Sequence, residues 1–158
     1  MKFDPELLAR DMPLLTRMNG VFVGEYLHVD EKGEETDRHA VHMRTWVDSD
    51  GRHQQNTYTW DDGRQEVHCF HNLYDGNAEL IFDNERIRGR CWEIDTTTVM
   101  LTWRRKDLPT THFCEIGQLS GDGQERTRLW HRFSDDRLAG RVLIRETRRP
   151  DDFPPPQV

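Results

Sequence analysis

Short runs of alternating polar and apolar residues, separated by turn-forming residues, recur along the chain. Val, Ile, Thr, Phe and Trp are frequent within the runs, and these residues favour the pleated surface of a strand. Asp, Asn and Gly gather between the runs, as at Asp48–Gly51 and Asp75–Asn77, where they form turns. The pattern predicts ten strands: Gly20–Asp30, Arg38–Asp48, Arg52–Trp60, Arg64–Leu73, Ala78–Asp83, Arg86–Ile94, Thr97–Arg105, Thr110–Leu119, Glu125–Ser134 and Leu138–Thr147.

Every predicted link is short, so strands that follow one another in the sequence should pair as antiparallel hairpins. A meander of this length exposes two edges unless it closes on itself. The sequence therefore predicts an all-β fold, namely an antiparallel up-and-down β-barrel of eight to ten strands, with a sandwich as the alternative. The 158 residues are enough for one such domain, which we assign to residues 1–148.

The two ends of the chain differ from the middle. Asp4 is a candidate helix N-cap, Pro5 suits the first helical position, and Pro13 should end that turn or start another. We expect residues 1–18 to form a helical cap that closes one mouth of the barrel. Residues 149–158 are rich in proline and are expected to form an extended, flexible tail.

Charge and cysteine content exclude several classes of function. The formal net charge of −7 argues against binding to nucleic acid or to an anionic membrane, because both partners require a concentrated basic face. The three cysteines, Cys69, Cys91 and Cys114, have no C-x-x-C spacing, which argues against disulfides and structural zinc. The N-terminal segment lacks the apolar run of a signal peptide. We expect a reduced, soluble, cytoplasmic protein.

The first predicted strand contains the stretch N-G-V-F-V-G-E-Y, with Gly20, Phe22, Gly24 and Tyr26 on one face. This stretch resembles the G-x-W signature that opens lipocalin-like (calycin) barrels, with Phe22 in place of the tryptophan. The order of a short helix and a meander is also similar to uncharacterised bacterial and cyanobacterial lipocalin-like proteins. In such families a late arginine closes over the aromatic ring, and the resemblance implies Arg141 or Arg145 for that place. It also implies a ligand cavity and names no substrate.

Several predicted strands carry aromatic and polar side chains on the same face. These faces are His42/Arg44/Trp46, Gln54/Asn56/Tyr58/Trp60 and His68/Phe70. A barrel interior that contacts a polar aromatic ligand has such a surface, and so does an outer surface with snorkelling aromatic rings. We favour the interior, and the predicted ligand contacts are then Phe22, His42, Trp46, Tyr58, Phe70, Leu129 and Phe133.

The stretch T-R-L-W-H-R-F, residues 127–133, has two contrasting faces. One face carries Arg126, Arg128, Trp130 and Arg132, and the other carries Thr127, Leu129, His131 and Phe133. Three arginines favour solvent, which predicts that the face with His131 points inward. On the last predicted strand Glu146 shares a face with Val142 and Ile144, so an inward carboxylate could pair with the imidazole. The alternative is a neutral core histidine bonded to a carbonyl or an acid.

These placements lead to a catalytic hypothesis. His131 would act as general acid or base, with Glu146 orienting it. Tyr26, His42 or His68 would handle a second proton, and Arg44 would balance a developing enolate or phenolate. The favoured function is a cofactor-independent lyase, isomerase or cyclase that acts on a small aromatic or polycyclic metabolite. The alternatives are a non-catalytic carrier of a hydrophobic molecule or tetrapyrrole, and a structural module that forms a homodimer through its strands.

Metal binding is the competing chemistry for the histidines. The spacings His39-x-x-His42 and His68-x-x-His71 are suggestive, but residues i and i+3 of a strand point to opposite faces. Histidines 42, 68 and 131 could still converge from different strands, and a haem would need one axial histidine. We predict that the protein uses neither a metal nor another cofactor.

Overall fold

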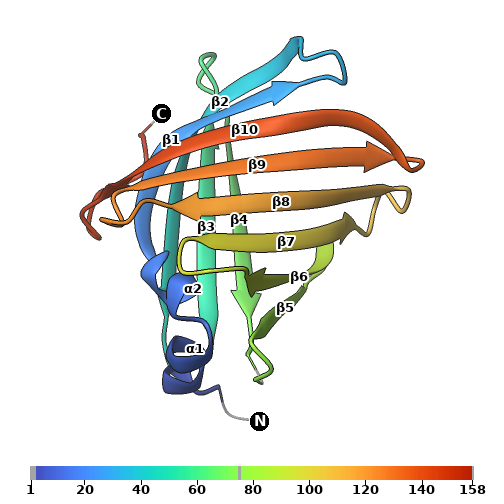
Figure 1. Ribbon diagram of the computed structural model, residues 1–158. Helices are drawn as coiled ribbons and strands as arrows, with labels where there is room; N and C mark the ends of the chain where they lie inside the picture. The colour runs from blue at the N-terminus through green and yellow to red at the C-terminus, as the bar shows by residue number, and fades with distance from the viewer. Residues whose placement is uncertain (1–2, 75, 158) are drawn as a thin grey trace.

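The computed structural model describes residues 3–74 and 76–157. The predicted helical cap, the turn at residues 75–77 and the tail are therefore described without Met1, Lys2, Asp75 and Val158, which lie outside the described residues. Two helices are followed by ten strands (Figure 1). Their bounds are α1 Pro5–Asp11, α2 Pro13–Arg17, β1 Gly20–Val29, β2 Glu35–Val47, β3 Arg52–Thr59, β4 Gln65–Asn72, β5 Glu79–Asp83, β6 Ile87–Glu93, β7 Thr98–Arg105, β8 Thr111–Leu119, β9 Glu125–Ser134 and β10 Arg137–Arg149.

The strands form one antiparallel sheet in the order β4-β3-β2-β1-β10-β9-β8-β7-β6-β5. Each strand pairs with its neighbour in sequence except at β4 and β5, and the first strand pairs with the last. The sheet curls into a nearly closed barrel whose seam, within the described residues, lies between β4 and β5 (Figure 1). The predicted antiparallel up-and-down barrel is confirmed, and the sandwich alternative is wrong.

Close contact between β1 and β10 requires a glycine at position 24. A Cβ atom on Gly24 would lie 1.9 Å from the backbone oxygen of Arg145. Because no side chain fits in that space, glycine is the residue that allows the first and last strands to approach each other here.

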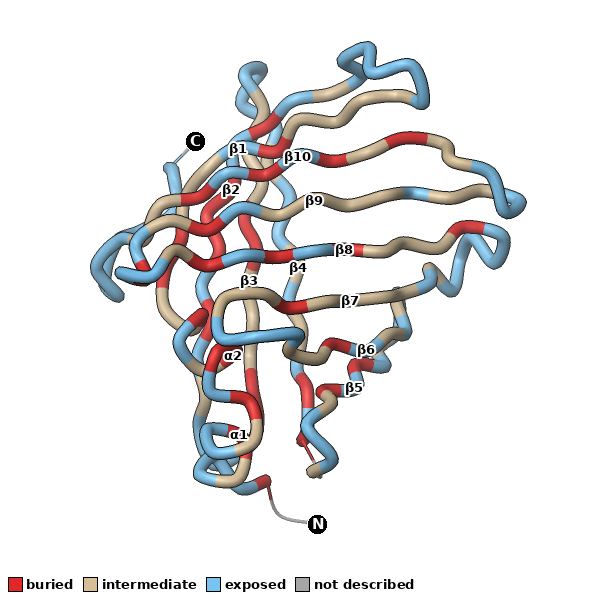
Figure 2. Tube along the Cα trace, in the orientation of Figure 1, coloured by how far each residue is buried: buried red, intermediate tan, exposed pale blue. Residues whose placement is uncertain are grey.

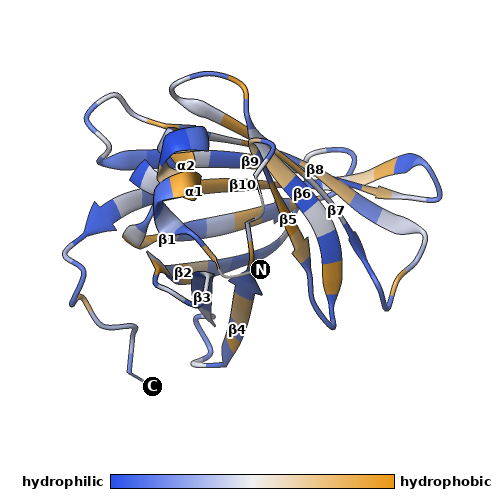
Figure 3. Ribbon diagram, turned by 90° about the horizontal axis from the view of Figure 1, so that it is seen from below, coloured by the Kyte–Doolittle hydropathy of each residue, from blue (hydrophilic) through white to orange (hydrophobic). Residues whose placement is uncertain are grey.

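The N-terminal helices begin where the sequence predicted. The Asp4 side chain accepts hydrogen bonds from the backbone N–H groups of Glu6 and Leu7, and Pro13 starts the second helix. Seen from below, the helices lie across one end of the barrel next to β1, and the strands mix hydrophobic and hydrophilic residues (Figure 3). Apolar helix residues pack there against strand residues in one cluster, which includes Leu8, Met12, Leu14, Leu15, Met18, Phe22, Leu80, Phe82 and Val99.

A second apolar cluster forms around Tyr26, with Val41, Met43, Val142 and Ile144. Every strand carries at least one buried residue, so burial follows the whole circumference of the barrel (Figure 2). In the described part of the chain, the two helices are too short to cross a membrane.

Residues 150–157 form no regular element and lie against the barrel. The backbone oxygen of Phe153 accepts a hydrogen bond from His42 on β2, at 2.8 Å. The backbone oxygen of Pro156 accepts one from Gln65 on β4, at 3.1 Å. The tail thus covers part of the outer surface near β2 and β4.

Candidate functional site

The barrel encloses a cavity of about 660 Å³. All ten strands contribute side chains to its lining, and Leu15 and Met18 contribute from the helical end. Sites for small molecules have volumes of roughly 300–1,000 Å³ and combine apolar walls with a few polar groups. The cavity therefore has the dimensions of a small-molecule site.

Aromatic rings form one wall of the cavity. Trp103 stacks on Phe113, with ring centroids 4.9 Å apart and planes 6° from parallel. Trp130 meets Trp103 edge to face at 5.0 Å and meets Tyr26 edge to face at 5.4 Å. Such packing holds the rings in fixed orientations and presents a flat apolar surface to the interior.

A chain of polar side chains lies on β3. Gln54 donates a hydrogen bond to Asn56, and Asn56 donates one to the hydroxyl of Tyr58, at 3.1 and 2.8 Å. These residues alternate with outward-facing ones, so all three point into the cavity together with Trp60. They supply donors and acceptors that a polar ligand could use.

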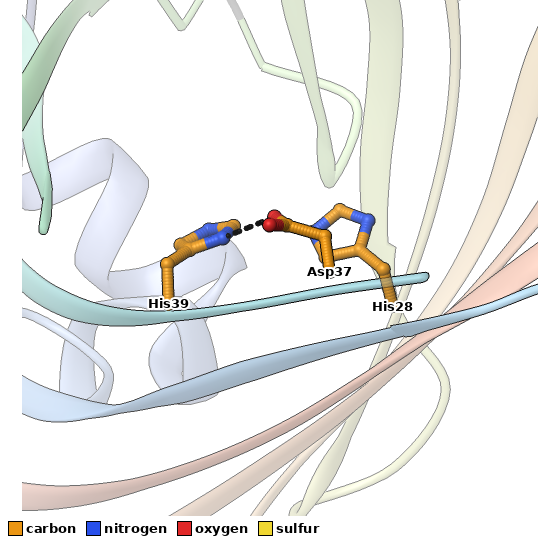
Figure 4. Close-up of side chains that lie close together, drawn as sticks. All are labelled: His28, Asp37 and His39. Carbon is orange, nitrogen blue, oxygen red and sulfur yellow. Dashed lines mark hydrogen bonds and ion pairs between the residues drawn. The ribbon is translucent and has the colours of Figure 1, made fainter. Parts of the chain in front are cut away.

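His28, Asp37 and His39 form a compact cluster at the cavity (Figure 4). His28 on β1 pairs directly with Asp37 on β2, and His39 follows two residues later on the same face. Nδ1 of His39 lies 2.9 Å from Oδ2 of Asp37, and the indole N–H of Trp60 donates to Oδ1 at 3.0 Å. Figure 4 shows the carboxylate between the two imidazoles.

Electrostatics within this cluster favour an ionised acid beside a neutral base. Although burial alone would raise it, the hydrogen bonds from His39 and Trp60 hold the pKa of Asp37 below its usual value. Burial, assisted by the nearby His39, lowers the pKa of His28. In the neutral tautomer of His39 whose Nδ1 donates to an ionised Asp37, Nε2 of that ring is a proton acceptor.

The same cluster could hold a metal ion. Its three potential ligand atoms lie within 4.8 Å of one another, and Nε2 of His28 is buried without a hydrogen-bond partner among the described residues. Two imidazoles and one carboxylate suit a divalent transition metal. A second group with this spacing, Asp50, His53 and His71, lies away from the cavity lining.

Buried ion pairs join β8, β9 and β10. Glu146 lies 2.7 Å from Nε of Arg126 and 2.9 Å from an Nη atom of Arg128, and Arg128 also contacts Glu115 at 3.4 Å. Arg128 donates a further hydrogen bond to the hydroxyl of Tyr26. Burial opposes ionisation of Glu146, but the two arginines lower its pKa to about 2. Glu146 is therefore an ionised partner of arginines.

Four of the predicted site residues line the cavity. They are Tyr26, Tyr58, His68 and Phe70. His68 contacts Glu66 at 3.3 Å and receives a hydrogen bond from Arg86. The inward faces that the sequence predicted for β3 and β4 are correct, because each of these strands places its row of polar and aromatic side chains toward the interior.

Phe22 is fully buried in the core cluster with the helices. The guanidinium carbons of Arg126 and Arg148 lie 4.1 and 4.5 Å from the centre of its ring. Position 148 pairs directly with position 22 across β1 and β10, whereas the side chain of Arg145 is 83% exposed. The expectation that Arg141 or Arg145 closes over the ring is wrong, and Arg148 takes that place on the last strand.

The predicted orientation of β9 is wrong. Arg126, Arg128, Trp130 and Arg132 line the cavity, which places Leu129, His131 and Phe133 on the outer face. Arginines are stable inside because buried carboxylates pair with them. The outer face is partly apolar because one register row joins Leu27, Leu143, Leu129 and Ile116. His131 and Glu146 consequently lie on opposite sides of the sheet and form no pair.

The predicted orientation of β2 is also wrong. Asp37, His39 and Met43 line the cavity, so His42, Arg44 and Trp46 point outward. His42 is buried beneath the tail through its bond to Phe153, Arg44 lies over the ring of Trp46, and Trp46 stacks on His53. Covering by the tail explains why an outward histidine is buried.

Within each His-x-x-His spacing the two histidines point to opposite faces of their strand, as the sequence predicted. His39 and His68 line the cavity, while His42 contacts the tail and His71 contacts the backbone oxygen of Asp50. Histidines 42, 68 and 131 do not converge. The sequence interpretation missed His28, Asp37 and Trp60 as a unit with His39. Antiparallel pairing of β1 with β2 places His28 opposite Asp37. The register shifts between His28 and Val29, so counting residues outward from the turn does not reveal this pairing.

No protein-family model and no curated protein sequence matches this chain. Among solved structures, the fold is similar to that of a protein of unknown function from the DUF3598 family of Nostoc punctiforme, with a TM-score of 0.66 and 14% identity. The match covers 85% of this chain and 49% of that protein, so the chain spans about half its length. The structure of EF1p2_mFAP2b bound to DFHBI has a TM-score of 0.47 and 10% identity, over 86% of this chain and 97% of that one.

Proposed function

We propose that this chain is a lipocalin-like barrel that binds a small molecule with a flat aromatic part in its cavity. The observation that carries the proposal is the cavity of about 660 Å³ with the stacked pair Trp103 and Phe113 in its wall. Stacked rings offer a planar apolar contact that a packed core would cover with other side chains.

The polar part of the lining supports a ligand that also carries hydrogen-bonding groups. The side-chain network of Gln54, Asn56 and Tyr58 lines the same cavity from β3. Asn56 is 4% exposed, so water competes weakly for its hydrogen bonds. A wholly apolar ligand would leave the remaining donors and acceptors of these three side chains unused.

The binding test uses a neutral aromatic probe, 2-naphthalenemethanol, in isothermal titration calorimetry. We expect saturable binding of one molecule per chain to the wild type. Trp103→Leu should weaken binding by roughly three- to tenfold, because it removes the stacked surface. Trp46→Leu is the matched control on the outer surface and should leave the affinity unchanged. Lack of saturable binding, or equal losses in both variants, would contradict the proposal.

Acid–base catalysis is a second candidate function, favoured by the hydrogen bond between Asp37 and His39 inside the cavity. The reaction would be a metal-independent lyase, isomerase or cyclase step on the bound aromatic molecule. Nε2 of His39 would accept the proton, Asp37 would orient the ring and stabilise its charged form, and Tyr26 or His68 would handle a second proton. His39 thus replaces His131 as the candidate base.

Catalysis is tested by incubating the protein with a set of aromatic metabolites and detecting products by mass spectrometry. A turned-over compound should lose about a hundredfold or more in rate in His39→Gln, because one acid or base group typically contributes that much. His42→Gln, on the outer face of the same strand, should retain the rate. Equal rates in wild type and His39→Gln would remove His39 from the mechanism.

A further inference from the structure

The charged side chains buried inside the barrel do not balance. Three are arginines, Arg52, Arg126 and Arg128, and two are glutamates, Glu115 and Glu146; each is at most one-tenth exposed. Arg126 and Arg128 contact the two glutamates, so each of these arginines has a carboxylate partner, and burial raises the pKa of Glu115. The excess positive charge is that of Arg52.

Arg52 begins β3 and lines the cavity. It is 6% exposed, and its Nε atom has no hydrogen-bond partner among the described residues. Arg126 has the same sign of charge and lowers the pKa of Arg52 by repulsion. The Nε–H group of this guanidinium is thus removed from water without a hydrogen bond in exchange among the described residues, which is unfavourable.

Neighbouring groups do not neutralise this cation. Burial lowers the pKa of Arg52 to about 10, which leaves the guanidinium charged at neutral pH. The thiol of Cys91 is the other ionisable group that influences it, and burial raises the pKa of that thiol to about 12. Cys91 is therefore uncharged at neutral pH and supplies no counter-charge.

The rest of the cavity also favours a negative ligand. Apart from Arg52, six arginines and three carboxylates are among the lining residues, although the whole chain has a net charge of −7. Asn72 lies directly opposite Arg52 on β4, lines the same cavity and is 6% exposed. The NH2 group of its side-chain amide can donate a hydrogen bond to an anion held beside Arg52.

We infer that Arg52 binds the carboxylate of the cavity ligand, so the ligand is an aromatic monocarboxylate. This inference rests on the proposed binding function and names the class of molecule. One unpaired guanidinium matches one carboxylate, and its planar set of N–H donors fits the two carboxylate oxygens. The flat apolar part of the molecule would then contact the wall formed by Trp103 and Phe113.

The test compares two probes that share a ring system and differ in charge, 2-naphthoate and 2-naphthalenemethanol. Calorimetry at pH 7 in chloride-free buffer should show tighter binding of 2-naphthoate to the wild type. Arg52→Gln should weaken 2-naphthoate binding by about 10- to 100-fold, because a charge-assisted hydrogen bond is lost. The same variant should leave 2-naphthalenemethanol binding within about twofold.

Arg145→Gln is the matched control, since it removes the same charge from an exposed position on β10. It should leave the affinity for both probes unchanged. Arg52→Lys provides a second measurement: it keeps the charge, loses the planar donor set and should bind 2-naphthoate with intermediate affinity. If Arg52→Gln does not fold, the comparison of Arg52→Lys with the wild type decides the result.

The outcomes separate this inference from the proposed binding function. Saturable binding of 2-naphthalenemethanol with equal affinity for 2-naphthoate would support the cavity and overturn the role of Arg52. Unchanged 2-naphthoate binding in Arg52→Gln would overturn it as well, and would indicate that internal water satisfies the guanidinium. Lack of binding of either probe to the wild type would instead overturn the binding function itself.

Discussion

The interior of this barrel contains two kinds of arginine that differ in their surroundings. Arg126 and Arg128 are buried against Glu146 and Glu115, and they hold β8, β9 and β10 together through ion pairs. Arg52 is equally buried on β3, but no carboxylate of the described residues forms an ion pair with it. A paired buried arginine has its donors occupied and serves the fold, whereas an unpaired one keeps its donors available to a ligand.

The largest effect on stability should follow from removal of the Glu146 carboxylate, which Arg126 and Arg128 share. Glu146→Gln leaves two buried cations without their principal partner, and we expect the free energy of unfolding to fall by about 3–5 kcal/mol. Urea denaturation followed by circular dichroism measures the loss. Glu25→Gln, at an exposed position on β1, is the control and should change stability by about 0.5 kcal/mol or less. Similar losses in both variants would refute the importance of the buried pairs.

The pH dependence of stability should report the same network. The pKa of Glu146 is lowered from 4.5 to about 2 in the folded protein, so its contribution is complete above pH 4.5 and disappears as the pH falls through 2. A shift of this size corresponds to roughly 3 kcal/mol. Denaturation at a series of pH values should show this decline in the wild type and a smaller one in Glu146→Gln. Parallel curves for the two proteins would contradict this assignment.

Substitution of the unpaired arginine, Arg52, should raise the free energy of unfolding. Arg52→Met removes a buried cation that has no counter-charge among the described residues, and without ligand we expect the free energy of unfolding to rise by about 1–2 kcal/mol. The same urea denaturation measures the change. A loss of several kcal/mol would show that the folded protein itself already stabilises the Arg52 guanidinium.

The smallest effect is expected on the outer face of β9. His131 lies on the side of the strand opposite to Arg128 and Trp130, away from both kinds of arginine. His131→Gln should change stability by about 0.5 kcal/mol or less and leave 2-naphthoate binding unaltered. Calorimetry and denaturation of this variant measure both quantities. A clear loss of binding would place His131 in the site after all.

The regular arrangement of the strands follows from local signals. The predicted strand Glu125–Ser134 coincides with β9, and the Asp4 cap and Pro13 define the two helices. Turn residues act through their own side chains and backbone, so neighbouring sequence is enough to locate them. The mixed polar and aromatic faces of β3 and β4, such as that of Tyr58, were also assigned correctly, whereas the mixed face of β2 was not.

Which face of β2 and β9 points inward was decided only by the tertiary structure. A strand with three arginines on one face turns that face inward because Glu115 and Glu146 arrive from neighbouring strands to pair with them. His42 is buried because the tail returns from residue 153 to cover it. The sequence alone determined the ten strands, the turns between them and the helical cap, because these depend on residues close together in the chain. The cavity, the unpaired Arg52 and the cluster at Asp37 depend on contacts between distant strands, whose register includes a shift that local patterns do not encode.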